Sequence, residues 1–121
     1  MGTLTQRFTK YGWCDLTPAA HTWEYHRKSH KKRPLFFTVF GNNPHNVTMF
    51  LGAVHGDETP AAYLVFKIAD YLKAHPDLYK NKTIVVAPLV NPDGFFAAPQ
   101  TRTNAICIDC NRNLPTKDWR K

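Results

Sequence analysis

A histidine and a glutamate three positions apart, His55 and Glu58, stand between an apolar segment and the start of an amphipathic one, in the run VHGDETP. An imidazole nitrogen and a carboxylate oxygen can share one zinc ion at about 2.0–2.2 Å from each. The pair alone is a weak signal, because a glutamate here also favours a helix N-terminus and the histidine can be an ordinary residue at the edge of a sheet. A solvent-exposed loop therefore remains the alternative to a metal site.

Residues suited to binding a carboxylate follow nearer the end of the chain: Arg102 in TRTN, and Asn111 and Arg112 in DCNRN. A guanidinium binds a carboxylate through paired, charge-assisted hydrogen bonds, so these side chains, if they converge near a metal, would form a socket for a carboxylate. Surface arginines in ordinary ion pairs are the alternative. Between the two groups lies Asn91–Gly94 (NPDG), whose composition turn formation alone would explain.

Two apolar segments before His55 predict strands. Residues 35–40 (LFFTVF) and 47–54 (VTMFLGAV) are rich in β-branched and aromatic residues and flank the turn-rich GNNPHN, which favours two antiparallel strands. The second segment is apolar almost throughout, so we expect it in the centre of the sheet. Residues 1–34 are polar and interrupted by prolines, and we expect them to form an edge segment of the same domain.

The segments after Glu58 predict a crossover. From Pro60 to about Ala74 apolar residues recur every three or four positions, which indicates an amphipathic helix, and residues 83–89 (TIVVAPL) indicate another strand. Strand, helix and strand in this order favour a right-handed parallel connection, which brings Asn91 to the same sheet edge as His55. We therefore expect the α/β class, with a mixed, mostly parallel central sheet flanked by helices.

In their order, HGDE, LVNPDGF and TRTNAICIDCNRNLPTKDW resemble the zinc metallocarboxypeptidase family, and within it the bacterial murein-peptide amidase and carboxypeptidase branch. The likeness covers residues 35–119. It implies that 35–121 form the N-terminal half of a catalytic domain that holds one zinc ion. The roles that it implies are zinc ligation by His55 and Glu58, polarisation of the scissile carbonyl by Arg102, binding of the substrate's terminal carboxylate by Asn111 and Arg112, and a pocket floor formed by Asn91–Gly94. Asp57 and Asn104 resemble supporting residues.

By this resemblance the third zinc ligand and a catalytic glutamate lie further along than NRN, and the sequence ends at Lys121. We expect the chain alone to be incomplete, inactive and exposed at an apolar sheet edge, with the missing half or a second chain as a partner. The expected reaction is zinc-dependent hydrolysis of a peptide or amide bond next to a free carboxylate, with murein peptides as the expected substrate. The alternatives are a deacylase of the aspartoacylase and succinylglutamate desuccinylase type, and a non-catalytic, truncated carboxylate-binding remnant.

The formal charge is +7, and much of it lies in the run from His26 to Arg33. The run lacks interleaved aromatic residues and any nucleic-acid-binding motif, so we expect no nucleic-acid partner; an anionic substrate or cell-wall polymer fits the sign of the charge. The N-terminus has no apolar stretch typical of a signal peptide, and no run of roughly 18 apolar residues occurs. We expect a soluble protein of the bacterial cytoplasm or periplasm, two compartments that the sequence does not distinguish.

Overall fold

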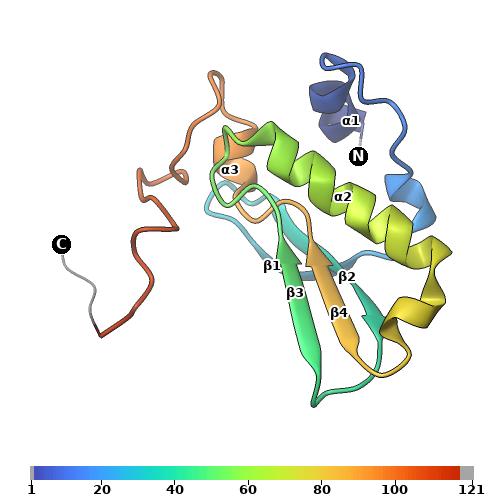
Figure 1. Ribbon diagram of the computed structural model, residues 1–121. Coiled ribbons are helices and arrows are strands. Elements are labelled where there is room, and N and C mark those ends of the chain that lie inside the picture. The colour runs from blue at the N-terminus through green and yellow to red at the C-terminus, as the bar shows by residue number, and fades with distance from the viewer. Residues whose placement is uncertain (1, 118–121) are drawn as a thin grey trace.

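The computed structural model of the chain describes residues 2–117. Asp118 and Trp119 of the TKDW motif lie outside the described residues. The elements are the helices α1 (Gly2–Thr9), α2 (Thr59–Ala74) and α3 (Pro92–Phe95), the 3-10 turns η1 (Pro18–Ala20) and η2 (Pro76–Tyr79), and the strands β1 (Glu24–Lys28), β2 (Pro34–Gly41), β3 (Val47–Leu51) and β4 (Thr83–Ala87). The strands form one open sheet in the order β1-β2-β4-β3 (Figure 1).

The sheet is mixed, so the predicted α/β class is confirmed. Strands β3 and β4 are parallel neighbours joined by α2, as the strand–helix–strand pattern predicts. The pairs β1–β2 and β2–β4 are antiparallel, so parallel pairing is the minority among the described strands and the expectation of a mostly parallel sheet does not hold for them. Strands β2 and β3 run in opposite directions as predicted, but β4 lies between them.

The expectation that β3 is a central strand is wrong for the described residues. Strand β3 has β4 as its one neighbour in the described sheet, and Val47, Met49 and Leu51 are 52%, 59% and 50% exposed. The two interior positions belong to β2 and β4, and Ile84 and Val86 of β4 are buried. Strand β3 therefore forms one edge of the described sheet and carries exposed apolar side chains.

Strand β1 was not predicted, because its sequence EYHRK is polar and every residue in it is exposed. It pairs with β2 at the other edge of the sheet, with Glu24 opposite Phe37 and Lys28 opposite Pro34. The backbone ladder, and not burial of side chains, holds this strand in place. Residues 1–34 thus contribute an edge strand, as well as the helix α1.

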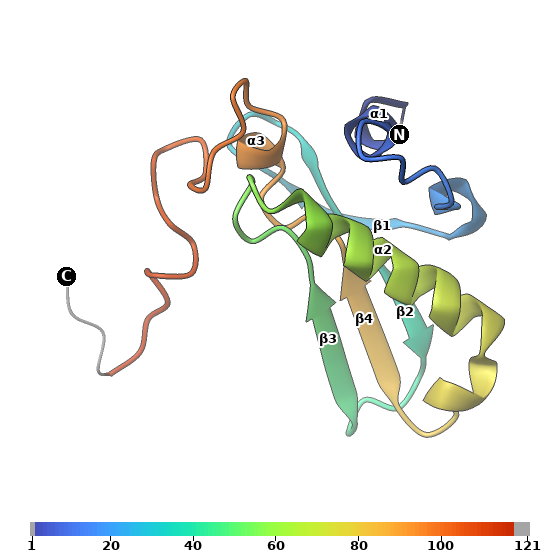
Figure 2. The same cartoon turned by 45° about the horizontal axis from the view of Figure 1, so that its top comes forward.

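One face of the sheet is covered by α2 (Figures 1 and 2). The residues that α2 buries recur at three- and four-residue spacing, as its sequence predicts. They pack on the alternate residues of β4 and on β2, and α1 closes one end of the core with Leu4 and Phe8. The buried members of α2 are Thr59, Ala62, Val65, Phe66, Ala69 and Leu72. This helix fixes the position of the loop that precedes it, where Glu58 is the first flanking residue.

The parallel ladder continues beyond the ends of β3 and β4. The N–H of Val90 donates to the carbonyl of Gly52 at 2.9 Å, and that of Asn91 donates to the carbonyl of Ala53 at 3.0 Å. The two strands therefore leave the sheet side by side at its carboxyl edge, where α/β proteins place their ligand sites. His55 and Asn91 follow at once, as the sequence pattern predicts.

Candidate metal and carboxylate site

His55 is the buried centre of the candidate site, with a side chain that is 6% exposed. Its Nδ1 lies 3.0 Å from Oε1 of Glu58, and its Nε2 lies 3.0 Å from Oδ1 of Asp109. The N–H of Glu58 donates to the carbonyl of His55 at 3.2 Å, which closes a tight turn between the strand and α2. The glutamate side chain is 51% exposed. The predicted donor pair is therefore together, with a buried imidazole and an accessible carboxylate.

Asp109 connects the histidine to Arg102. Its Oδ2 accepts a hydrogen bond from Nε of Arg102 at 2.8 Å, and its Oδ1 accepts one from the N–H of Asn111 at 2.9 Å. Sequence reasoning assigned no role to Asp109, although it stands in the DCNRN run. General chemistry could have indicated it, because an imidazole that ligates a metal usually donates a hydrogen bond from its other ring nitrogen to a carboxylate.

The charges of this cluster shift two pKa values. Burial raises the pKa of Asp109, but the hydrogen bonds from Arg102 and His55 outweigh it and hold that pKa at about 2. The hydrogen bond to Glu58 raises the pKa of His55; burial opposes this shift, and the contact with Asp109 adds to it. Asp109 is therefore an anion at neutral pH, placed between an arginine and an imidazole.

The NPDG segment holds the loop that carries Arg102. The Oδ1 of Asn91 accepts from the N–H of Gly94 at 3.0 Å, which caps α3, and its Nδ2 donates to the carbonyl of Thr103 at 3.1 Å. Asn91 is buried, and a Cβ added to Gly56 would lie only 2.2 Å from the carbonyl carbon of Gly94. The loop after His55 and the turn of α3 thus touch backbone to backbone. Turn propensity alone does not explain NPDG.

Asp93, in the same segment, fastens the β1–β2 turn. Its Oδ1 accepts from Oγ of Ser29 at 2.7 Å and from Nη1 of Arg33 at 3.0 Å, and its Oδ2 accepts from the N–H of Lys31 at 3.0 Å. Burial raises the pKa of Asp93, but these hydrogen bonds outweigh it and leave the pKa below its ordinary value. The basic turn is therefore anchored to α3 by a buried carboxylate.

Asn111 and Arg112, the residues expected to hold a substrate carboxylate, lie in the turn that follows Asp109. Both are exposed, and the Nη1 of Arg112 donates to the carbonyl of Asn111 at 2.9 Å. The backbone N–H of Arg112 donates to the carbonyl of Asp109 at 3.1 Å. Asn104 supports the same loop, since its Oδ1 accepts from the N–H groups of Ile106 and Ile108. The structure brings His55, Glu58 and Arg102 together through Asp109, with Asn111 beside them.

The donor atoms present fit part of a zinc site. Within residues 2–117 no group of three or more His, Cys, Asp or Glu side chains could hold a metal ion, whereas catalytic zinc normally has three protein ligands. The two candidate ligand atoms, on His55 and Glu58, are 3.0 Å apart. An ion about 2.0–2.2 Å from both, in tetrahedral geometry, needs them only a few tenths of an ångström further apart. The spacing of this pair is therefore compatible with two of three zinc ligands.

Comparisons with known proteins agree on one family. The sequence profile described as zinc carboxypeptidase matches residues 17–121. Mouse carboxypeptidase M is 32% identical over 108 residues, which cover 73% of this chain and 24% of that protein. A putative carboxypeptidase A from Shewanella denitrificans has a similar structure, with a TM-score of 0.68, 24% identity, and coverage of 88% of this chain and 31% of that one.

A deacylase fold is also similar. The succinylglutamate desuccinylase/aspartoacylase of Rhodobacter sphaeroides matches with a TM-score of 0.57 at 20% identity, over 84% of this chain and 32% of that one. The present chain thus spans about a quarter of the curated relative and a third of the solved structures. Within residues 2–117 no helix has the length and apolar character needed to cross a membrane. The profile match extends over most of the sequence, and the chain belongs to the zinc carboxypeptidase family, whose members are zinc-dependent hydrolases.

Proposed function

We propose that this chain supplies two zinc ligands and the carboxylate-binding residues of a metallocarboxypeptidase that cleaves the peptide or amide bond next to a free C-terminal carboxylate. The observation that carries the proposal is the pair His55 and Glu58 at the carboxyl edge of the sheet, linked through Asp109 to Arg102. A histidine and a carboxylate are both usual ligands of catalytic zinc.

Each residue of the cluster has a part in this proposal. Asp109 accepts a hydrogen bond from the Nε2–H of His55, which leaves the lone pair of Nδ1 for the metal. Because the Nε of Arg102 is held by Asp109, its two terminal nitrogens remain to donate to a carbonyl oxygen that becomes negative during the reaction. Zinc, when bound, supplies a water whose pKa is lowered toward ~7. Asn111 and Arg112 would hold the terminal carboxylate of the substrate.

Within residues 2–117 no third donor completes a metal site, so the proposal takes the third ligand and a general base from residues outside this range. We propose that the remaining part of a carboxypeptidase domain supplies them, in the same polypeptide or in a second chain, and that 35–121 correspond to the N-terminal half of that domain. The chain covers 24% of mouse carboxypeptidase M, which leaves ample length for such a part. With two ligands, the 121-residue chain should bind zinc weakly and show no turnover.

A zinc titration tests the ligand assignment directly. The titration compares the chain with Glu58→Gln and with the matched control Glu24→Gln, which changes an exposed glutamate on β1. We expect binding weaker than micromolar, lost in Glu58→Gln and unchanged in Glu24→Gln. Equal zinc affinity in Glu58→Gln and the unmodified chain would refute the assignment, as would peptide hydrolysis by the unmodified chain alone.

The narrower substrate is a cell-wall peptide, as the resemblance to murein-peptide amidases implies, and the +7 charge favours an anionic polymer of this kind. A deacylase of N-acylated amino acids is the second candidate, because the fold also matches a succinylglutamate desuccinylase/aspartoacylase. Three substrates distinguish the peptidase from the deacylase when the chain is joined to a completing half. They are a murein tetrapeptide, a peptide blocked as its C-terminal amide, and N-acetylaspartate. The peptidase assignment requires cleavage of the first alone. A carboxylate-binding chain without hydrolysis of any of the three would be the non-catalytic alternative.

A further inference from the structure

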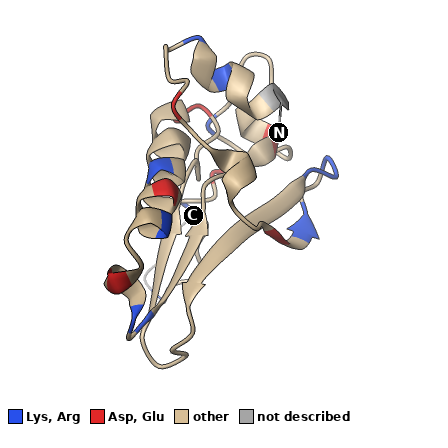
Figure 3. Cartoon of the chain, turned by 90° about the vertical axis from the view of Figure 1, so that its right-hand side faces the viewer, with Lys and Arg blue, Asp and Glu red and all other residues tan. Residues whose placement is uncertain are grey.

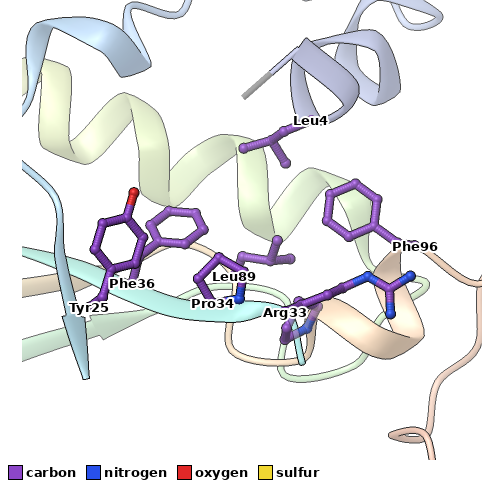
Figure 4. Close-up of a pocket in the computed structure, with 8 residues that line it drawn as sticks. Leu4, Tyr25, Arg33, Pro34, Phe36, Leu89 and Phe96 are labelled. Carbon is purple, nitrogen blue, oxygen red and sulfur yellow. The ribbon is translucent and has the colours of Figure 1, made fainter. Parts of the chain in front are cut away.

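A cavity lies between α1 and the hairpin of β1 and β2, beside the end of α3 (Figure 4). Its volume is about 380 Å³, at the lower end of the ~300–1,000 Å³ typical of small-molecule pockets. Its walls are mostly apolar; they include Pro92 of the NPDG segment but none of the side chains proposed to bind zinc or the substrate, which are His55, Glu58, Arg102, Asn111 and Arg112. The main lining residues are Leu4, Tyr25, Arg33, Phe36, Leu89 and Phe96.

The apolar walls belong to the packed core, so the cavity is preformed. Leu4, Phe36 and Leu89 are 4%, 9% and 2% exposed and are members of the larger hydrophobic cluster. Phe96 packs against the same cluster from the end of α3. Because core residues packed behind these side chains hold them in place, an apolar ligand would enter without prior rearrangement.

One cationic group, Arg33, stands in this apolar setting. Its Nη1 donates to Asp93 at 3.0 Å, and its guanidinium carbon lies 5.7 Å from the centre of the Phe96 ring. A guanidinium has five N–H donors, and among the described residues the side chain has no hydrogen-bond partner other than Asp93. Its remaining N–H groups are free to bind a carboxylate through two parallel hydrogen bonds.

The surrounding charge favours an anion. Asp93 is the carboxylate that contacts Arg33, and its oxygens also accept from Ser29 and Lys31. The four side chains that define the basic hairpin beside the cavity, those of Arg27, Lys28, Lys31 and Lys32, make no ion pair with any of residues 2–117, and Figure 3 shows the blue Lys and Arg positions of this hairpin. Unneutralised cations on this side raise the local concentration of anionic solutes.

We propose that this cavity binds a small amphipathic carboxylate, with its apolar body against Leu4, Phe36 and Leu89 and its carboxylate on Arg33. Figure 4 shows Arg33 at one end of the cavity and Tyr25 at the other, so the ligand lies along the line between them, with its tail toward the tyrosine ring. The proposal does not require zinc or any residue of the His55 cluster. A medium-chain fatty acid has the required combination of one charge and one apolar body.

Three small probes test the proposal on the full chain by isothermal titration and by NMR chemical-shift mapping. Octanoate has both head and tail, octan-1-ol has the tail alone, and acetate has the head alone. We expect saturable binding of one octanoate per chain, with the signals of Leu89 and Phe96 shifted, and affinities for the other two probes at least about tenfold weaker, because charge-assisted hydrogen bonds and apolar burial both contribute. Octanol binding as tightly as octanoate, or the absence of octanoate binding, would overturn the proposal.

Variants separate this cavity from the carboxylate-binding residues of the proposed function. Arg33→Gln should weaken octanoate at least about tenfold, and Arg33→Lys, which keeps a cation, should weaken it less. Arg27→Gln removes one hairpin cation outside the lining and should weaken octanoate far less than Arg33→Gln does. Arg112→Gln changes the proposed substrate socket and should leave octanoate affinity unchanged. If Arg112→Gln abolishes binding, or Arg27→Gln lowers it as much as Arg33→Gln does, the cavity is not the site. Because Arg33 also holds Asp93, each variant's melting curve is recorded, and if Arg33→Gln fails to fold, the shift map of the unmodified chain decides.

Discussion

Replacing Gly56 by alanine is the sharpest test of how the candidate site is held. A Cβ at this position would lie 2.2 Å from the carbonyl carbon of Gly94 and 2.4 Å from the backbone nitrogen of Phe95, whereas ordinary contacts of a Cβ lie at 3.4–4 Å. The obstructing atoms are backbone, so no side chain can turn aside. The loop after His55 and the turn of α3 would have to separate by on the order of 1 Å.

The cost of Gly56→Ala follows from this contact. An extra methyl group in a packed interior lowers the free energy of unfolding by about 1–3 kcal/mol where side chains can adjust. Here the obstructing atoms belong to the backbone, so we expect a loss at the upper end of this range. At roughly 4 °C per kcal/mol for a chain of this size, the melting temperature should fall by about 12 °C. The same displacement moves His55 away from Glu58, so zinc binding should weaken in parallel.

Thermal and urea unfolding followed by circular dichroism measure this loss, and Gly12→Ala is the matched control. Gly12 has φ +76°, and a Cβ there would meet no atom within 4 Å, so its replacement carries only the conformational cost of about 1 kcal/mol. If Gly56→Ala melts no lower than Gly12→Ala, the close approach of the two loops does not hold the site, and the reasoning fails.

Three further predictions concern single carboxylates and the sheet edge. Because the pKa of Asp93 is lowered in the fold, its ionised form stabilises the protein at pH values above the ordinary 3.8, and this stability is lost as the pH falls through the lowered pKa. Asp93→Asn should therefore lower the free energy of unfolding by about 1–3 kcal/mol at neutral pH and reduce its decrease toward acid pH in urea titrations. An unchanged decrease toward acid pH would contradict the contacts described. Asp109→Asn should weaken zinc binding by about 10- to 100-fold in the same titration as Glu58→Gln, because the imidazole loses the carboxylate that orients it; equal affinity would count against that role. Met49→Lys on the edge strand β3 should reduce concentration-dependent association in analytical ultracentrifugation, whereas Leu114→Lys, an equally exposed position off the sheet, should not; equal effects would exclude the edge as the contact.

The elements that depend only on local sequence patterns were predictable from the sequence. The spacing of Ala62, Phe66 and Ala69 along α2 specifies which face is buried, whatever that face packs against. The crossover from β3 to β4 follows from the order of the elements, and with it the meeting of His55 and Asn91 at one edge. Both predictions needed only periodicity and chain order.

Strand order and the role of Asp109 were not predictable in the same way. The run VTMFL is apolar on both faces, which is the pattern of a central strand, yet which strand becomes its neighbour depends on the rest of the sheet. Strand β1 has no apolar face to reveal it, since its stability comes from the ladder with β2. Asp109 bonds a histidine 54 positions earlier in the chain, and a single sequence contains nothing that pairs the two.

The free edge of β3 and the incomplete set of zinc donors lie at the same place in the fold. His55 lies four residues after the end of β3, and the outer side of this strand has no neighbour among the described residues. A strand added there in the parallel direction would end beside His55, because carboxyl ends of parallel strands meet at one edge. Such a strand would pair with the free backbone groups of β3, pack beside its exposed side chains, and bring the residues after it to within reach of the donor pair. One segment would then supply both a partner strand for β3 and the further zinc donors. We therefore expect that adding a completing half raises zinc affinity and abolishes self-association at the same time.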